Sequence, residues 1–181
     1  MKPLGNKDRI CGSLFAKEKK MAQFKKTNAM RILDKAGIDY TYEEYEYDEN
    51  DLDGHHVAEF LGIPYEEVFK TLTCVSDKGE YLVFCISVDD EIDLKKAAVL
   101  AGVKRVDMIH VKDLLNVTGY IRGGCSPIGM KKQYRTFIDE MAELIDSICV
   151  SAGQRGVQLR LKPEDLISFT NAVVGDFAVR S

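Results

Sequence analysis

The sequence predicts one α/β domain built on a mixed, curved β-sheet with helices around it. Two apolar stretches, residues 70–75 and 81–88, flank the turn Asp77–Glu80, which is typical of a β-hairpin. Apolar residues at helical spacing, with capping residues beside them, occur before and after this hairpin. Because hairpins and helices are interspersed along the chain, the sheet should mix parallel and antiparallel strands and should not be a doubly wound parallel sheet.

The individual elements follow from apolar periodicity and from helix start and stop signals. Thr27 is the expected N-cap of the first helix, Gly37 its stop, and Asp93 the cap of a later helix. The tyrosines of residues 40–47 shift from even to odd positions, which predicts a bulge in that strand. Helices are expected at 27–36, 57–61, 93–100, 111–115, 140–144 and 163–169. Strands are expected at 40–47, 70–75, 81–88, 106–109, 136–138, 148–150, 157–161 and 173–177, with a long loop over 116–132.

Bulk composition limits the class of protein. The chain has 181 residues, 45% hydrophobic and 30% charged, so one domain with a substantial core is expected. No run approaches 18 apolar residues, and the N-terminus lacks a secretion pattern, which predicts a cytoplasmic protein without membrane contact. Residues 1–24 lack periodicity and are expected to form a flexible extension before a domain over 25–181. Met21 is an alternative start of the natural protein.

The five cysteines indicate free thiols. Their number is odd and no two stand in a CxxC spacing, which is unlike a disulfide framework and typical of a reducing compartment. Cys74, Cys85 and Cys149 lie in apolar, strand-like runs and are expected to be small buried side chains. Cys125 differs, because it lies in a glycine-rich loop.

Charge is distributed unevenly, although the net charge is only −4. Residues 39–53 carry eight acids and no base, which we interpret as a solvated surface. Residues 120–135 carry Arg122, Lys131, Lys132 and Arg135 and no acid. Such a local basic face suits a phosphate backbone even on a mildly acidic protein.

The sequence has no clear motif for a protein nucleophile or for a metal site. No GxSxG elbow exists, and the histidines are His55, His56 and His110. Cys125 has a setting typical of a reactive thiol, but no base accompanies it in the sequence. His55 and His56 are adjacent, so their side chains diverge, and no spacing fits zinc. No metal and no cofactor is therefore expected.

The glycine-rich run TGYIRGGCSPIGMKK (118–132) and Lys70 are the remaining candidates. The glycines let backbone N–H groups turn toward a ligand oxygen, as stabilisation of an oxyanion requires, while a tight structural turn is the alternative. Lys70 begins an apolar strand. Its ammonium either reaches solvent or binds a carbonyl or phosphate in a pocket.

Four stretches resemble the YbaK/EbsC family, the free-standing relatives of the editing domain in bacterial prolyl-tRNA synthetases. They are VFKTL (68–72), DLKKAA (93–98), TGYIRGGCSPIGMKK (118–132) and VSAGQRG (150–156), in the family's order. The resemblance covers about residues 27–177 and implies a single domain with a barrel-like mixed sheet. It implies deacylation of mischarged tRNA in trans, chiefly Cys-tRNA(Pro) and also Cys-tRNA(Cys). The implied partners are tRNA and, transiently, prolyl-tRNA synthetase, with no role for DNA.

The resemblance also assigns roles to residues. Lys70 matches the essential lysine that holds the substrate near its terminal adenosine and ester. The loop from Gly123 to Pro127 matches a GxxxP loop whose backbone contacts the scissile carbonyl. The catalytic candidates are therefore Lys70, Gly123, Gly124 and Pro127, and the substrate-binding candidates are Tyr45, Thr71, Cys125, Ser126, Ser151 and Gly153. Gln158, where some members have an acid, and residues 51–54, where some have a phenylalanine, depart from the pattern.

The family chemistry accounts for the missing nucleophile. In cysteine-specific members the substrate's own thiol attacks its ester and leaves as a cyclic thiolactone, so positioning and oxyanion stabilisation suffice. Three alternatives stay open at this point. They are a deacylase for alanine or serine on tRNA, a non-catalytic module that binds tRNA or synthetase, and a thiol enzyme that uses Cys125.

Overall fold

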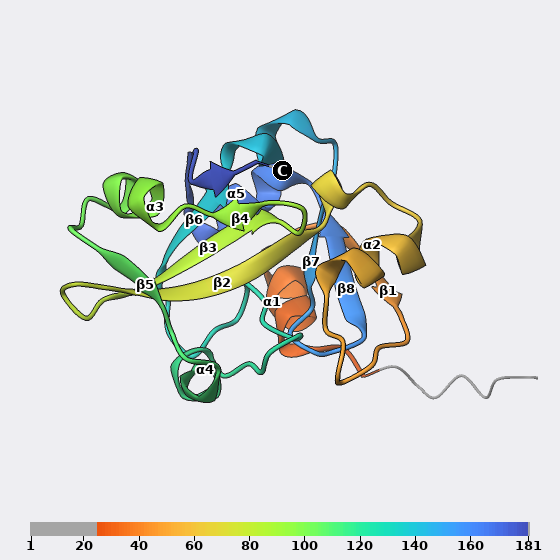
Figure 1. The fold of residues 1–181 in the computed structure, drawn as a ribbon. Helices are drawn as coiled ribbons and strands as arrows, with labels where there is room; N and C mark the ends of the chain where they lie inside the picture. Colours follow the sequence, from red (N-terminus) through yellow and green to blue (C-terminus); the bar gives the residue numbers. More distant parts are fainter. Residues whose placement is uncertain (1–24, 181) are drawn as a thin grey trace, which may run out of the picture.

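A five-stranded mixed sheet forms the centre of the computed structural model, which describes residues 25–180 (Figure 1). In spatial order its strands are β5 (Val106–Met108), β2 (Phe69–Ser76), β3 (Tyr81–Ser87), β6 (Arg135–Asp139) and β9 (Val173–Gly175). Strand β2 pairs antiparallel with β3 and β5, while β6 pairs parallel with β3 and β9. The predicted mixed sheet and hairpin are therefore confirmed. The extension expected over residues 1–24 lies outside the described residues.

A second sheet continues the first around the core. Its order is β1 (Tyr40–Glu44), β8 (Val157–Leu161) and β7 (Ile148–Ser151), all antiparallel. A parallel bridge between Val68 and Cys149 connects this sheet to the chain just before β2. The two sheets thus meet at one edge, as a curved, barrel-like arrangement requires. A small pair, β4 (Glu91–Ile92) and β10 (Ala178–Val179), lies beside them.

The helices cover these sheets. They are α1 (Asn28–Ala36), α2 (Gly54–Leu61), α3 (Leu94–Ala101), α4 (Val111–Thr118) and α5 (Pro163–Thr170), with 3-10 turns η1 (Tyr65–Glu67) and η2 (Glu140–Leu144). The predicted caps are present, since the Met30 N–H donates to Thr27 and the Lys95 N–H to Asp93. Within residues 25–180, every helix is too short or too polar to cross a bilayer.

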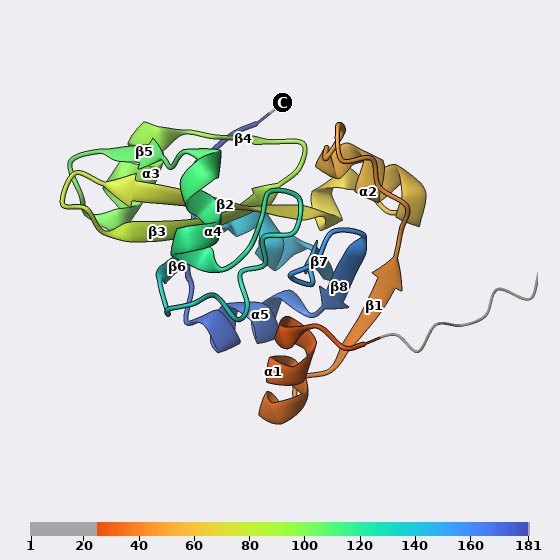
Figure 2. The ribbon, with the colours of Figure 1, turned by 90° about the horizontal axis from the view of Figure 1, so that it is seen from below.

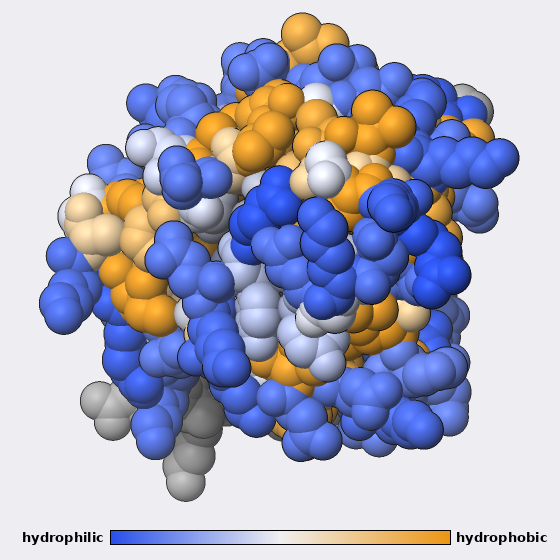
Figure 3. All heavy atoms as spheres, turned by 90° about the vertical axis from the view of Figure 1, so that its left-hand side faces the viewer, coloured by the Kyte–Doolittle hydropathy of each residue, from blue (hydrophilic) through white to orange (hydrophobic). Residues whose placement is uncertain are grey.

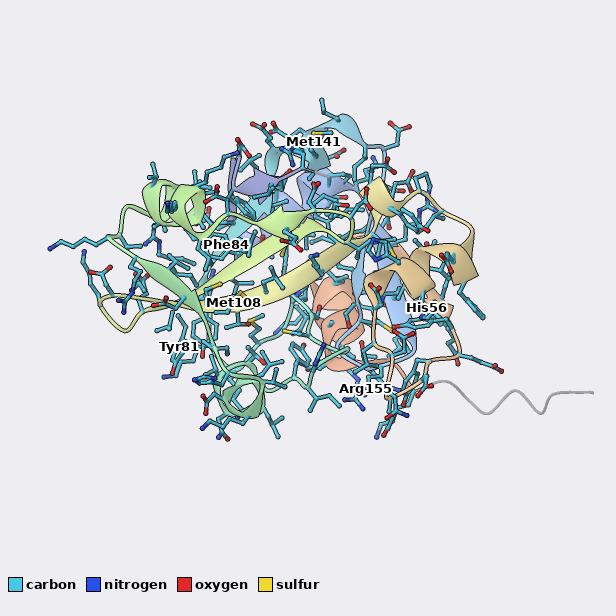
Figure 4. The ribbon with its side chains drawn as sticks, in the orientation of Figure 1. His56, Tyr81, Phe84, Met108, Met141 and Arg155 are labelled. Carbon is cyan, nitrogen blue, oxygen red and sulfur yellow. The ribbon has the colours of Figure 1, made fainter. Side chains whose placement is uncertain are left out.

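Side-chain alternation along β3 divides the core in two. Val83 and Cys85 face the cluster that includes α1 and α5, while Leu82, Phe84 and Ile86 face the cluster that includes α3. Figure 2 shows α4 and the loop after it on the side of the sheet opposite α3. Phe84, labelled in Figure 4, stacks on Phe137 with ring centroids 4.8 Å apart. Burying one such ring stabilises the fold by about 1.5–3 kcal/mol.

The surface over α3, β5 and α4 carries apolar side chains between polar ones (Figure 3). Val99, Met108, Val111 and Leu115 are among the exposed residues there. In contrast, Cys74, Cys85 and Cys149 are fully buried, as expected.

Several sequence-based boundaries were wrong. The strand expected over 40–47 ends at Glu44 without a bulge, because its partner β8 begins opposite it at Val157, directly after Gly156. The segment 140–144 forms a 3-10 turn, since it must lead into β7 within a few residues. Helix α2 begins earlier than expected, at Gly54, and α4 extends to Thr118. Strands β4 and β10 have two residues each, too few to show a period.

Candidate functional site

A cavity of about 520 Å³ lies where the two sheets meet, and we call it the central cavity. Segments far apart in the sequence form its wall. They are the start of β2, the residue after β3, the N-terminus of α2, the glycine-rich loop, β7 and β8. The lining residues used below are Tyr45, Leu52, Asp53, Gly54, Lys70, Thr71, Val88, Arg122, Gly123, Cys125, Ser151 and Gln158.

Lys70 is half-buried in this wall. Its Nζ donates a hydrogen bond to the carbonyl oxygen of Val88 at 3.2 Å. Burial lowers the pKa of the Lys70 ammonium from its ordinary 10.5, while Glu91 and Asp53 act against this shift. An ammonium has three donors, so two remain for a ligand oxygen. The arrangement provides one directed positive charge inside a polar cavity.

The N-terminus of α2 brings an acidic residue to the same wall. The Asp53 carboxylate accepts from the N–H of His55 at 3.1 Å and lies 2.8 Å from its Nδ1. These contacts lower the pKa of Asp53 and raise the pKa of His55. The other ring nitrogen of His55 lies 3.3 Å from Asp89. His55 therefore acts as a bridge between two carboxylates.

The glycine-rich loop fits closely against two other segments. Gly123 has a φ of +83°, and a Cβ there would lie 2.9 Å from Leu52. A Cβ on Gly124 would lie 3.1 Å from the backbone nitrogen of Arg155. Position 123 thus favours glycine for its backbone conformation, and position 124 favours it because a Cβ would be tight against the backbone of a neighbouring loop.

The N–H groups of this loop differ in their partners. The N–H of Gly124 donates to the carbonyl of Ile121 at 3.0 Å, so it holds the turn together. For Gly123 and Cys125, no acceptor within residues 25–180 bonds the N–H. Both of these residues line the central cavity. Two residues of the cavity wall therefore carry backbone donors without a bonded acceptor, and Gly124 has a structural use.

Four of the predicted site residues do not line this cavity, and the Gly124 of the loop turn is one of them. Ser126 is fully buried, and its Oγ accepts from the N–H of Ile128 at 3.2 Å. Pro127 lines a separate cavity of about 320 Å³ near α1 and α5. Gly153 packs on the ring of Tyr120, and its N–H donates to the Oγ of Ser151 at 3.2 Å. They shape the loops that carry the lining residues.

Cys125 lines the central cavity but is a poor nucleophile. Burial raises the pKa of its thiol to about 11, so the thiol is protonated at neutral pH. None of His55, His56 and His110 lines the central cavity, so no imidazole base is present there. These observations argue against a thiol enzyme.

Tyr45, Ser151 and Gln158 form the wall contributed by the second sheet. The Nε2 of Gln158 donates to the Tyr45 hydroxyl at 3.4 Å, and Ser151 pairs with Gln158 across β7 and β8. Gln158 is only 7% exposed. In the sequence, Gln158 departs from the residue that some family members have at this position. Its contact with Tyr45 was not predicted, because the two residues are 113 positions apart.

The predicted basic face is divided among several places. Arg122 lines the central cavity, and Lys132 lines the cavity of Pro127. Lys131 donates to the carbonyl of Asn116, and Arg135 pairs with Glu80. The four cations therefore do not form one continuous basic surface.

Long-range contacts add residues that the sequence did not single out. Figure 4 places Arg155 below the second sheet, and its Nε donates to the Arg122 carbonyl at 2.9 Å. Leu52 and Val88 line the central cavity. In the sequence, Leu52 follows a run of acids and Val88 ends an apolar strand, so neither position carries a local signal for a binding site.

The described range offers no metal centre, since no three His, Cys, Asp or Glu side chains between residues 25 and 180 are grouped to hold an ion. His56 instead lies 3.2 Å from Asp51. In Figure 4, His56 is seen on α2.

Comparisons with known proteins agree with the resemblance drawn from the motifs. A protein of Enterococcus faecalis named "Putative Cys-tRNA(Pro)/Cys-tRNA(Cys) deacylase EbsC" is 48% identical over 153 residues, which cover 84% of this chain and 92% of that protein. Proline–tRNA ligase of Staphylococcus aureus is 25% identical over 103 residues, which cover 57% of this chain and 18% of the ligase.

A solved structure described as "a putative trans-editing enzyme for prolyl tRNA synthetase" has the same fold. Its TM-score is 0.72 at 22% identity, over 82% of this chain and 93% of that chain. The family model described as "Aminoacyl-tRNA editing domain" matches residues 53–169, which contain most of the central cavity. The predicted family and fold are confirmed, and the chain belongs to the aminoacyl-tRNA editing domain family.

Proposed function

We propose that this chain is a trans-editing deacylase that clears mischarged tRNA, above all Cys-tRNA(Pro) and also Cys-tRNA(Cys). The observation that carries the proposal is the central cavity, whose wall brings together Lys70 with Gly123 and Cys125, two residues whose backbone N–H groups have no bonded acceptor within residues 25–180. Family membership supports the reaction class, and the name of the E. faecalis relative supports cysteine as the amino acid.

The proposed reaction uses the thiol of the substrate. The sulfur attacks the carbonyl carbon of its own ester, and the oxyanion that forms accepts from the N–H groups of Gly123 and Cys125. The bond to the ribose oxygen then breaks, that oxygen takes up the proton given by the thiol, and cysteine leaves as a cyclic thiolactone. Lys70 holds the terminal adenosine and ester. Tyr45, Thr71 and Ser151 shape the space for the amino acid.

The test is a deacylation assay on tRNA(Pro) charged with cysteine, alanine, serine or proline. Cysteine should be released fastest and proline no faster than in buffer. Faster release of alanine or serine would reassign the substrate to another small amino acid. If none is released faster than in buffer, the chain is no deacylase, and retained tRNA binding would then identify a non-catalytic binding module.

A second substrate separates the mechanism from the specificity. S-methylcysteinyl-tRNA(Pro) has nearly the shape of the substrate but no thiol. It should resist deacylation if the thiol is the nucleophile. Release of S-methylcysteine at a rate near that of cysteine would point to attack by water.

We also propose a transient encounter with prolyl-tRNA synthetase, which would hand the mischarged tRNA over. This proposal is supported by the likeness to the ligase. Sedimentation of the two proteins with and without tRNA(Pro) tests it, and a complex should form only in the presence of tRNA.

A further inference from the structure

The N-terminus of α2 makes an unusually close contact beside Lys70. A Cβ built on Gly54 would lie 2.2 Å from Cγ1 of Val88, which is shorter than real contacts allow, and 3.0 Å from its Cβ, which is tight. Gly54 has no positive φ, so its backbone would accept any residue. Glycine is also a poor helix former. The closeness to Val88 is therefore what requires glycine at this position.

Val88 is the residue whose carbonyl oxygen accepts the hydrogen bond of Lys70. Its N–H donates to the carbonyl of Val68 at 2.8 Å, so the residue is held on one side by the chain just before β2. Its side chain is buried against Val57 and Ala58 of α2. The helix thus holds Val88 on the other side, and Gly54 sets how closely the helix approaches.

We propose that Gly54 is a positioning residue for Lys70: it lets α2 seat Val88 so that the Val88 carbonyl fixes the ammonium in the central cavity. The inference rests on the proposed function for its catalytic consequence only. A side chain at position 54 would push Val88 and its carbonyl away from Lys70. The Lys70 ammonium would then lose its fixed position although every cavity-lining functional group is still present.

The test uses Gly54→Ala, the double variant Gly54→Ala with Val88→Ala, and Gly175→Ala as the matched control. A Cβ on Gly175 would meet Cδ1 of Leu100 at 2.7 Å, a milder clash with the end of a side chain outside the central cavity. Gly54→Ala should lower kcat/KM for Cys-tRNA(Pro) on the order of 10- to 100-fold, as a misplaced group does. The double variant removes the clashing methyl and should recover to within about threefold of the starting protein. Gly175→Ala should keep its activity.

A readout without substrate separates this proposal from the proposed function. The NMR resonance of the Lys70 Cε and Nζ should shift in Gly54→Ala, stay in place in Gly175→Ala and return in the double variant. An unshifted resonance in a folded Gly54→Ala protein would overturn the inference, as would a folded double variant with the shift of the single one. If Gly54→Ala does not fold, two double variants are compared, both of which carry Val88→Ala. One has Gly54→Ala and the other Gly54→Ser, and the larger serine side chain must displace Lys70 more. If no variant and no starting protein deacylates any substrate but the NMR pattern is as expected, the proposed function is refuted and the positioning role of Gly54 stands.

Discussion

The charge of Lys70 depends on a balance between three contributions. Burial disfavours the ammonium, the Val88 carbonyl favours it, and Asp53, Asp89, Asp90 and Glu91 favour it at longer range. The net effect lowers the pKa of the Lys70 ammonium below its ordinary 10.5. A substrate ester and phosphate would therefore meet a positive charge that is already desolvated in part.

Lys70→Ala should lower kcat/KM for Cys-tRNA(Pro) by at least about 100-fold, since a partly buried charged donor to the substrate is lost. Lys78→Ala is the matched control, because Lys78 is exposed at the turn between β2 and β3. The measurement is release of labelled cysteine. Equal activity of the two variants would remove Lys70 from the mechanism.

The lowered pKa of Lys70 predicts a pH dependence with a definite sign. The ammonium is present below its pKa, so affinity for a non-hydrolysable aminoacyl-adenosine amide should be highest at pH values below that pKa. It should fall as the pH rises through a midpoint below 10.5. Lys70→Arg should lack this fall, because a guanidinium stays charged there. Calorimetric titration from neutral pH up to 10.5 would measure both, and identical profiles would contradict the prediction.

Cys125 and Gly123 should behave in opposite ways. Cys125→Ala keeps the backbone N–H and should retain most of the deacylase activity. Gly123→Ala adds a Cβ in contact with Leu52 at a φ of +83° and should lose at least about tenfold in kcat/KM. Steady-state kinetics on Cys-tRNA(Pro) compare them. Loss of activity in Cys125→Ala alone would revive the thiol enzyme.

At the scale of elements, the C-terminal segment around β10 links β4 to the end of β6. Strand β10 pairs with β4, and Arg180 beside it reaches Asp139 at 2.8 Å and Asp90 at 3.2 Å. The Asp139 side chain is only 1% exposed, while that of Arg180 is 37% exposed. One half-exposed guanidinium thus neutralises a buried carboxylate at the end of β6.

Arg180→Ala should lower the free energy of unfolding by about 3 kcal/mol, because it leaves the buried Asp139 carboxylate unpaired. This value is the lower end of the range for a broken buried pair, given the exposure of Arg180. Arg105→Ala is the control, since Arg105 and Asp107 form an exposed pair worth less than about 1 kcal/mol. Urea unfolding measures the difference, and similar losses in both variants would contradict it.

At the scale of the whole molecule, the central cavity belongs to the edge where two sheets meet. The bridge between Val68 and Cys149 joins them there, and Gln158 reaches Tyr45 across 113 positions of sequence. Local signals such as Thr27, Asp93 and Gly37 predicted helix ends correctly, because capping involves neighbouring residues. The wall formed by Leu52, Val88 and Gln158 was missed, because its closeness arises only from long-range pairing. Lys70, Tyr45 and Ser151 were placed through a resemblance, and their roles stay predictions.

A fragment of residues 25–181 should fold and keep its deacylase activity. The three apolar clusters of the core and the whole lining of the central cavity lie within it. Thermal unfolding and kcat/KM of the fragment and the full chain make the comparison. A fragment that folds but deacylates at least about tenfold more slowly would assign residues 1–24 a part in substrate binding.

The burial of Cys125 has a consequence for a protein that would handle free cysteine. Mixed disulfides form through thiolates, and a thiol with a pKa of about 11 has roughly one molecule in ten thousand ionised at pH 7. Cys74, Cys85 and Cys149 are buried as well, and their pKa values are raised to about 12. Cystine or a cysteinyl product should therefore pass through the central cavity without forming mixed disulfides with the four cysteines of residues 25–180.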